Sequence, residues 1–521
     1  MKYPSFSFWK AAAPALAIAA IALLPLTPVS AQVTMTWNPG GAGVGSGNWS
    51  LNPGDTNWNN GSANVTWTTT STSGVADKAV FGGADGTAGQ YVVTLSSNVS
   101  VGTIPALNFQ SSGYIIQASN NQTISFSSTY VNETVNVSAG KTAEIGSKVT
   151  LAFNQTTEVN GGGTLNVSGR LQQNTNNGFV ISGNSTLNFL AGGSGLVQGS
   201  WQVGSTTDAG RFSQLIVSGG NVTMNQNGSN LVLANVSGLT SAANLTISSG
   251  SLLMTGTTST AGIRFASTTG NASTNMTGVV NLDGGTLQTN RFFEGSATGN
   301  ISSTVNFNGG ILKLGNNATT TNYLGVDNAI VKAGGARIDT NGQSLSLSNN
   351  FTEDPLSTGG GFEKRGAGTL TLTAVNGFTG NTTVTEGTLV LSSTGSVASS
   401  TLGFGVKDAT NGLLTVQNAG FSFSGNLTLD LATVTVSSGS WTLFNGAEFG
   451  AGDLNLADLT SNLVGLSFSN SSGVWSGTDL SSRTWTFTED SGVLQVVPEP
   501  TTWALVGLGL GATLFFRRRK D

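Results

Sequence analysis

A short phrase of residues recurs along this chain, and its spacing constrains the fold more than any other feature. Glycine or asparagine comes first, then Thr or Ser alternates with Leu, Val or Ile, as in Gly163–Val167, Gly285–Leu287 and Gly387–Leu391. The separation is 19 residues from Leu370 to Leu389, 25 from Leu389 to Leu414, and 24 from Leu287 to Ile311. Alternation with period two is typical of strands that bury one face. Repeats of this length bury their apolar faces only by stacking on their neighbours.

These repeats predict an all-β chain in which residues 81–490 form one right-handed parallel β-helix. Successive coils would pair at ~4.8 Å per step, and parallel connections are right-handed by default. At about 23 residues per coil, we expect roughly 15–18 coils and a rod about 75–85 Å long. Asn-Gly and Gly-Gly steps, such as Asn341-Gly342, would make the corners that need positive φ. A set of antiparallel β-sandwiches is the alternative fold.

The composition excludes most catalytic chemistry. The 521 residues include neither cysteine nor histidine, so disulfides, thiolate or imidazole metal ligands, and serine–histidine or cysteine–histidine nucleophiles are impossible. Six of the 20 basic and two of the 25 acidic residues lie in the two terminal segments, which leaves the body with a net charge of −9. This body lacks the basic surface of a nucleic-acid binder. We expect no nucleic-acid partner, no metal and no cofactor.

One segment, residues 361–392, carries a more specific pattern. Its order is K-x-G-x-G-T-L-x-L, then F-T-G-x-T-x-V, then G-T-L-x-L. This order resembles the autotransporter-associated β-strand repeat of secreted β-helical passenger proteins. The resemblance implies a β-helical fold, a surface location, a core position for Phe378 and corner positions for Gly380 and Gly387. The chain departs from true autotransporters at its C-terminal end, so the resemblance does not imply self-secretion.

The N-terminal block, residues 32–80, differs in composition from the repeats. Four tryptophans lie there among Asn, Gly and Pro, namely Trp37, Trp49, Trp58 and Trp67. We expect this block to cap the open end of the β-helix and to cover its strand edges. The alternative is that the indole rings stack on sugars.

Residues 1–31 have the layout of a cleavable secretory signal peptide, with a basic start, the apolar stretch Ala11–Leu26 and small residues before the cleavage point. We predict a signal helix that is cleaved between Ala31 and Gln32. An uncleaved anchor is the alternative, although several prolines oppose a long spanning helix.

Residues 497–521 combine a polar motif, an apolar run and a basic cluster. The run Trp503–Phe516 has 14 residues, short beside the ~20 of a stable spanning helix. The arginines would stay on the cytoplasmic side. This order resembles the PEP-CTERM sorting signal, which a membrane-embedded exosortase recognises and is thought to cleave. The resemblance implies an exosortase-type partner and contact with the inner membrane through a C-terminal hydrophobic helix. The alternative to a sorting signal is an ordinary membrane anchor. The residues assigned to the signal are Pro498, Glu499, Pro500, Arg517, Arg518 and Arg519.

Some β-helical proteins cleave polysaccharides, using carboxylates, a basic residue and sometimes Ca²⁺ on one flank. The nearest candidates are Arg264, Asp283, Arg291, Arg337 and Asp339. They form no dense cluster in the sequence, and both aspartates lie beside turn residues, where Asp commonly bonds to its own backbone. We therefore assign no catalytic residue and predict a protein that is not an enzyme.

The sequence thus predicts an exported protein, anchored transiently in the membrane and then displayed on the cell surface or released into extracellular matrix. Its expected role is structural or adhesive. The alternative is a polysaccharide-binding protein, or a polysaccharide-degrading lyase or hydrolase.

Overall fold

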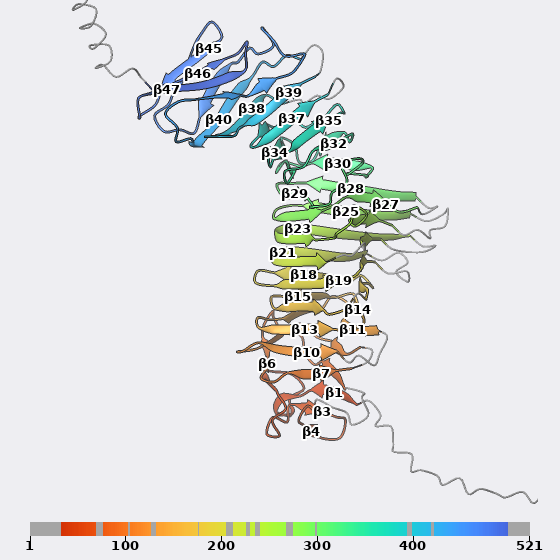
Figure 1. Ribbon diagram of the computed structural model, residues 1–521. Helices are drawn as coiled ribbons and strands as arrows, with labels where there is room; N and C mark the ends of the chain where they lie inside the picture. The colour runs from red at the N-terminus through yellow and green to blue at the C-terminus, as the bar shows by residue number, and fades with distance from the viewer. Residues whose placement is uncertain are drawn as a thin grey trace, which may run out of the picture.

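The computed structural model describes residues 33–68, 77–102, 105–126, 132–175, 177–204, 212–225, 230–234, 240–266, 275–296, 300–392, 399–417 and 421–498. Within these ranges the chain is built of strands β1 to β47, with one short 3₁₀ helix, η1 (Pro39–Gly41). Figure 1 shows an elongated body that rises as a column from β4 to β29 and then turns towards β47. None of the described ranges holds a helix long and apolar enough to cross a membrane.

The first face of the column is a 12-stranded sheet in which ten strands pair in parallel. Those ten are β1 (Thr34–Trp37), β5 (Lys78–Phe81), β8 (Leu107–Phe109), β11 (Asn132–Val137), β14 (Thr156–Asn160), β17 (Phe179–Ile181), β20 (Trp201–Val203), β22 (Leu231–Leu233), β24 (Ile263–Phe265) and β27 (Phe292–Glu294). The short strands β3 (Trp58–Asn59) and β4 (Asn64–Val65) continue this sheet beyond β1 by antiparallel pairing.

A 25-stranded sheet with parallel pairing forms the rest of the column. Its strands fall into two ladders of in-register neighbours, which are joined by two 14-residue strands that belong to both. Its strands up to β21 are β2 (Gly47–Trp49), β6 (Tyr91–Leu95), β7 (Val99–Val101), β9 (Tyr114–Gln117), β10 (Gln122–Phe126), β12 (Thr142–Ile145), β13 (Val149–Phe153), β15 (Thr164–Val167), β16 (Arg170–Gln173), β18 (Thr186–Leu190), β19 (Ser194–Gln198) and β21 (Phe212–Asn225). The others are β23 (Ser241–Met254), β25 (Asn275–Leu282), β26 (Thr286–Thr289), β28 (Asn300–Phe307), β29 (Ile311–Leu314), β30 (Asn328–Val331), β31 (Ala336–Asp339), β33 (Phe351–Glu353), β34 (Phe362–Arg365), β36 (Thr382–Val384), β38 (Thr401–Lys407), β40 (Asn426–Thr433) and β43 (Asp458–Ser461).

Two smaller sheets complete the body. The parallel one contains β32 (Leu345–Leu347), β35 (Thr369–Leu372), β37 (Gly387–Leu391), β39 (Gly412–Val416) and β42 (Phe444–Asn445). The antiparallel one contains β41 (Gly439–Thr442), β44 (Ser469–Ser471), β45 (Val474–Thr478), β46 (Arg483–Thr488) and β47 (Val493–Pro498). The repeat spacing did not predict this antiparallel sheet.

The register of the parallel strands explains the sequence spacing. Leu370 pairs with Leu389, and Leu389 pairs with Leu414, as expected from their separations. The third expected pair is wrong by one residue, because Leu287 pairs with Leu312 while Ile311 pairs with Thr286 and faces outward.

The core is a set of apolar columns that run along the axis. One column crosses eight successive strands, and its members are at most 2% exposed: Leu165, Leu187, Leu215, Leu245, Val280, Val305, Ala329 and Phe351. Outward positions carry polar ladders, such as Asn188 to Asn166 at 3.1 Å and Asn306 to Asn281 at 2.8 Å. The burial of each coil therefore depends on its neighbours, which is the behaviour of stacked repeats.

The all-β prediction is confirmed, and the parallel sheets are compatible with a β-helix. The antiparallel pairings in the described ranges lie mainly at the two ends, which does not fit a chain of sandwiches. The predicted signal helix and C-terminal hydrophobic helix lie outside the described residues.

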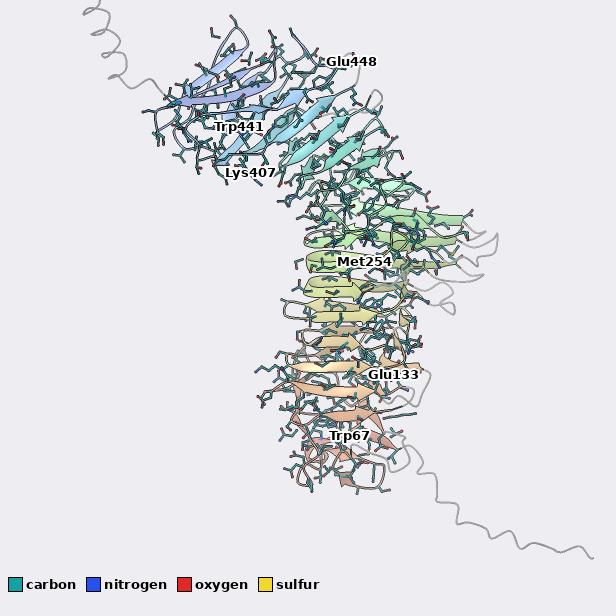
Figure 2. All side chains as sticks on the ribbon, viewed as in Figure 1. Trp67, Glu133, Met254, Lys407, Trp441 and Glu448 are labelled. Carbon is teal, nitrogen blue, oxygen red and sulfur yellow. The ribbon has the colours of Figure 1, made fainter. Side chains whose placement is uncertain are left out.

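The N-terminal tryptophans form a buried aromatic cluster. The ring of Trp58 lies 5.0 Å from that of Trp37, 4.9 Å from Trp49, 4.8 Å from Trp67 and 5.4 Å from Phe81, measured between centroids. All four indoles are at most 1% exposed, and Trp67 marks this end of the column in Figure 2. Stacking on sugars requires exposed rings. These tryptophans instead pack at the N-terminal end of the column, where β1 and β3 meet.

Candidate functional site

The segment that resembles the passenger repeat is organised around a buried lysine. Lys364 lies on β34 and is fully buried. Its Nζ donates hydrogen bonds to the carbonyl oxygens of Arg365 at 3.0 Å, Gly366 at 2.5 Å and Glu386 at 3.0 Å. Burial lowers the pKa of Lys364 to about 8, and the nearby negative charges of Asp339 and Glu386 oppose that shift. The ammonium group thus joins the corner that follows β34 to the matching corner of the next coil, which follows β36.

The other positions that the resemblance singled out have packing roles. Phe378 is fully buried and stacks on Phe362, with centroids 5.4 Å apart and ring planes at 17°. Gly387 has φ +73°, and a Cβ there would lie 2.4 Å from the carbonyl oxygens of Gly366 and Gly368. A Cβ at Gly380 would lie 2.4 Å from the carbonyl oxygen of Gly359. Phe378 is therefore in the core, as the resemblance implied. Gly380 lies in the bend before β36 and Gly387 begins β37, so both are at corners, as expected, and there the backbones approach closely.

Two of the five catalytic candidates belong to a charged ladder on β29, β31 and β34. Arg337 Nε lies 3.5 Å from Glu363 Oε2, and Arg365 Nε lies 3.1 Å from Glu363 Oε1. Asp339 Oδ2 is 3.9 Å from Lys313 Nζ, and its Oδ1 accepts from the backbone amide of Asn341 at 2.8 Å. The carboxylates of Glu363 and Asp339 both pair with basic side chains of the same sheet, which is typical of a structural charge network.

The other three candidates are held by local contacts. Arg264 Nε donates to the carbonyl of Ala266 at 3.2 Å. The guanidinium of Arg291 lies 3.7 Å from the ring centroid of Phe293, and its Nε donates to the carbonyl of Thr260 at 3.1 Å. Asp283 Oδ1 accepts from Asn308 Nδ2 at 3.1 Å. Asp283 follows β25 and Asp339 ends β31, two coils further on, so the structure does not bring the candidate carboxylates together.

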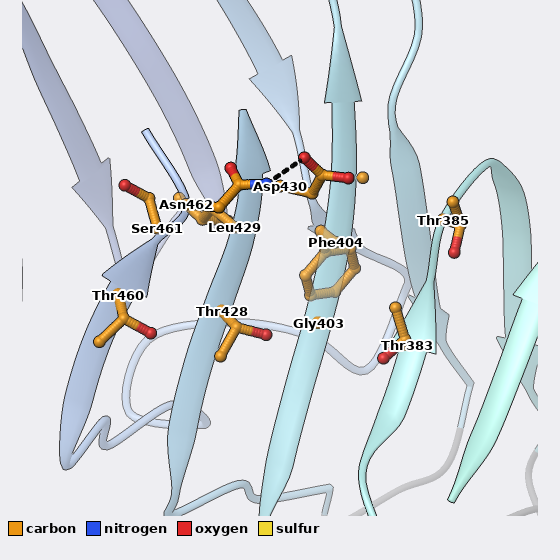
Figure 3. A pocket seen from close by; sticks show the side chains of 11 residues that line it. Thr383, Thr385, Gly403, Phe404, Thr428, Leu429, Asp430, Thr460, Ser461 and Asn462 are labelled. Carbon is orange, nitrogen blue, oxygen red and sulfur yellow. Dashed lines mark hydrogen bonds between the residues drawn. The ribbon is translucent and has the colours of Figure 1, made fainter. Parts of the chain in front are cut away.

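A groove that sequence reasoning missed runs over β36, β38, β40 and β43 (Figure 3). It is floored by Gly403 and Gly405 of β38, and we call it the glycine trough. Its cavity volume is about 410 Å³. Thr383 and Thr428 flank Gly403, and a Cβ on that glycine would lie 2.9 and 3.0 Å from their hydroxyl oxygens. The trough exists because two positions in this sheet have no side chain.

One end of the glycine trough carries a carboxylate. Asp430 Oδ1 accepts from Asn462 Nδ2 at 2.6 Å, the dashed contact in Figure 3, and from the amide of Ala432 at 3.3 Å. A second groove of about 360 Å³, lined by Arg337 and Glu363, meets the trough at Thr383.

A single in-register row lines both grooves. Its members come from six successive strands: Arg337, Glu363, Thr383, Gly403, Thr428 and Thr460. Such a row extends over roughly 24 Å at ~4.8 Å per step. The sequence signal was present as Thr-x-Thr at 383–385 and Gly-x-Gly at 403–405, 20 residues apart.

The chemistry of these grooves is limited. Glycosidases usually place two carboxyl groups across the scissile bond. Each groove is lined by one carboxylate, Glu363 or Asp430, and Glu363 also accepts from the Thr385 hydroxyl at 2.8 Å. In the described part of the chain, no group of three or more acidic side chains is placed to hold a metal ion.

The sorting-signal residues lie at or beyond the last strand. Pro498 ends β47 and pairs with Arg483, while Val497 pairs with Thr484 and is 49% exposed. Glu499, Pro500, Arg517, Arg518 and Arg519 lie outside the described residues, as do Ala31 and Gln32.

Two family models match segments of the chain. The passenger-associated-transport-repeat matches residues 362–391, which include Lys364 and Gly387. The PEP-CTERM protein-sorting motif matches residues 496–520 and so begins inside β47. No curated protein and no solved structure matches the chain. Both resemblances suspected from the sequence are therefore confirmed. The sorting motif marks an exported protein that is recognised by an exosortase and anchored transiently in the membrane.

Proposed function

We propose that this protein is a right-handed β-helical element of the cell surface or extracellular matrix, with a structural or adhesive role. The observation that carries the proposal is the position of the sorting motif. It begins within the last strand of a body made of stacked coils, so export and release deliver the whole rod. The tail would be cleaved at Pro498-Glu499-Pro500.

Three features support a role in which the surface of the protein makes contacts and no substrate is converted. Outward positions carry repeated Asn, Ser and Thr ladders, which offer many weak polar contacts. The candidate carboxylates Asp283 and Asp339 accept hydrogen bonds from their own surroundings. The apolar columns extend through the coils, so the rod is held by packing and needs no disulfide.

Cleavage is tested by measuring the mass of the surface-localised protein from cells that carry an exosortase. We expect a mass that lacks both the signal peptide and the segment after the Pro-Glu-Pro motif. Glu499→Ala should leave the tail on the protein, whereas the exposed control Glu448→Ala should not. An intact tail on the mature wild-type surface protein would contradict processing.

A second candidate function is polysaccharide binding along the row that lines the two grooves. The favouring observation is the row itself, in which the hydroxyl groups of Thr428 and Thr460 stand one rung apart, ~4.8 Å, and that of Thr383 lies on the other side of Gly403. Affinity electrophoresis of the mature protein against neutral and acidic glycans, with and without Ca²⁺, tests it. Thr428→Val and Thr460→Val should weaken retention several-fold, while Thr277→Val on the outer face of β25 should not. Retention that no variant changes would exclude this row as the site, and glycan turnover would contradict the non-enzymatic proposal.

A further inference from the structure

Exposed aliphatic side chains gather at one end of the last antiparallel sheet. Val464 is 79% exposed, Leu480 is 78% exposed and Val497 is 49% exposed. Leu480 lies in the turn between β45 and β46, and a Cβ on Gly465 would lie 2.5 Å from Leu480 Cγ. The turns that carry Val464 and Leu480 are therefore in contact. We call these three residues the apolar tip.

The turn that presents Leu480 is firmly built. Asp479 Oδ2 accepts from Arg483 Nε at 2.7 Å and from Trp485 Nε1 at 2.9 Å. Asp479 Oδ1 accepts from the amides of Ser481 at 2.8 Å and Arg483 at 3.1 Å. One guanidinium nitrogen of Arg483 also donates to the carbonyl of Val436 at 2.9 Å. Leu480 is thus held outward by the hydrogen bonds on both sides of it.

The turn that presents Leu480 carries little exposed charge, and an exposed carboxylate nearby, Asp408, is attracted to Arg483. The Asp479 and Arg483 side chains are 2% and 12% exposed and neutralise each other. Ser481 and Ser482 are the exposed neighbours of Leu480 in the turn. The tip therefore offers aliphatic groups and hydroxyls, a chemistry that matches the interfacial region of a lipid bilayer without requiring anionic lipid.

The tip lies at the end of the sheet where the chain leaves the body. Pro498 pairs with Arg483, which directly follows the turn of Leu480. β47, its neighbour β46 and the next strand, β45, form the blue end of the body in Figure 1. Trp503, the first residue of the apolar run, is five residues after Pro498. Five residues span at most about 18 Å when fully extended.

We propose that the apolar tip contacts the bilayer interface while the sorting segment anchors the protein. This proposal rests on the membrane anchoring that the sorting motif implies. Anchoring holds the tip at a high effective concentration near the lipid, so a weak contact of a few aliphatic side chains is enough to be populated. The contact orients the rod with its last sheet against the membrane before release.

The absence of cysteine makes a direct test possible, because each introduced cysteine is unique. The full chain carrying Leu480→Cys is labelled with the environment-sensitive fluorophore NBD and reconstituted into phosphatidylcholine vesicles that contain nitroxide-labelled lipid. The matched control is Leu356→Cys, since Leu356 is 95% exposed and follows β33 on the rod. We expect lipid nitroxides to quench the label at 480 at least threefold more than the label at 356. Equal quenching at the two sites overturns the proposal.

Two further measurements distinguish lipid contact by the tip from a failure of anchoring and from contact between copies of the chain. Flotation of the protein with the vesicles reports anchoring, and protein that does not float contradicts the anchoring itself, apart from any role of the tip. Shielding of the 480 label from aqueous iodide without lipid quenching indicates contact between copies of the chain and also overturns the proposal. With the label moved to Val464→Cys, the additional change Leu480→Glu should reduce lipid quenching to the level of the control.

Discussion

The ammonium nitrogen of Lys364 donates a hydrogen bond to the backbone carbonyl of Glu386, 3.0 Å away and one coil further along the chain. Together with its bonds to the carbonyls of Arg365 and Gly366, this contact explains why the repeat contains lysine two residues before glycine. Lysine supplies three donors at the tip of a long side chain, which matches three carbonyls that converge from two coils.

Replacing Lys364 by methionine should lower the free energy of unfolding at pH 7. The apolar stem is kept, but three partly buried carbonyls lose their donor, and the expected cost is roughly 2–4 kcal/mol. Lys407→Met is the control, because Lys407 is half-exposed and pairs with the side chain of Glu386 at 3.3 Å. The control should change stability by at most about 1 kcal/mol. Equilibrium denaturation measures both, and equal effects would contradict the proposed clamp.

The stability that depends on Lys364 should rise with pH in the alkaline range. Burial lowers the pKa of Lys364 from 10.5 to about 8 in the folded protein. Below pH 8 both states are protonated and the cost of burying the cation is present in full. Between pH 8 and 10.5 the unfolded state binds more protons, so the wild type should gain up to roughly 3 kcal/mol relative to Lys364→Met. A difference between the two proteins that stays constant over this range would be the contrary result.

Glu133 should give the opposite dependence at lower pH. Its side chain is 3% exposed, and burial raises its pKa from 4.5 to about 7 although the amides of Asn154 and Gln155 favour the charged form. The folded state then binds more protons than the unfolded state, so stability should fall as pH rises from 4.5 to 7, by up to roughly 3 kcal/mol. Glu133→Gln should lack this decline, whereas the exposed control Glu448→Gln should keep it; both positions are labelled in Figure 2. A decline that survives in Glu133→Gln would show that other groups cause it.

Trp58→Ala should destabilise the N-terminal end locally. The ring is fully buried against four aromatic neighbours, and its loss should cost roughly 3–5 kcal/mol. Because each coil contacts only its neighbours, hydrogen exchange should speed up in β1 and β5 and stay unchanged in β35 and β37. Trp58→Phe should have a smaller effect at the same place. Uniform loss of protection along the rod would contradict independent coils.

The parallel stacking could be predicted from the sequence because residues that pair on neighbouring coils are separated in the sequence by the length of one coil. Leu370, Leu389 and Leu414 lie on neighbouring coils in register, as their separations require. The error at Ile311 arose where two apolar residues are adjacent in Ile311-Leu312. Alternation alone does not show which of these two side chains faces the core, because the register with the neighbouring strand decides it.

Two other features could not be predicted for physical reasons. The antiparallel sheet of β41 and β44 to β47 has the same period-two alternation as the parallel strands, so local pattern does not separate the two kinds of sheet. The glycine trough depends on side chains that are absent at Gly403 and Gly405, and on the threonines of other coils that flank them. The C-terminal sorting motif could be assigned from the sequence because its order of residue types is itself the signal.

The measurement that tests the stacked, in-register body most directly is spin-label spectroscopy on one column. Thr142, Thr164 and Thr186 pair in register on β12, β15 and β18. With each replaced by cysteine in this cysteine-free chain and labelled with a nitroxide, spins ~4.8 Å apart should exchange strongly. The triple-labelled protein should then show a broadened or single-line spectrum, while each single-labelled variant shows three resolved lines. A triple-labelled spectrum equal to the sum of the three single-label spectra would contradict the account.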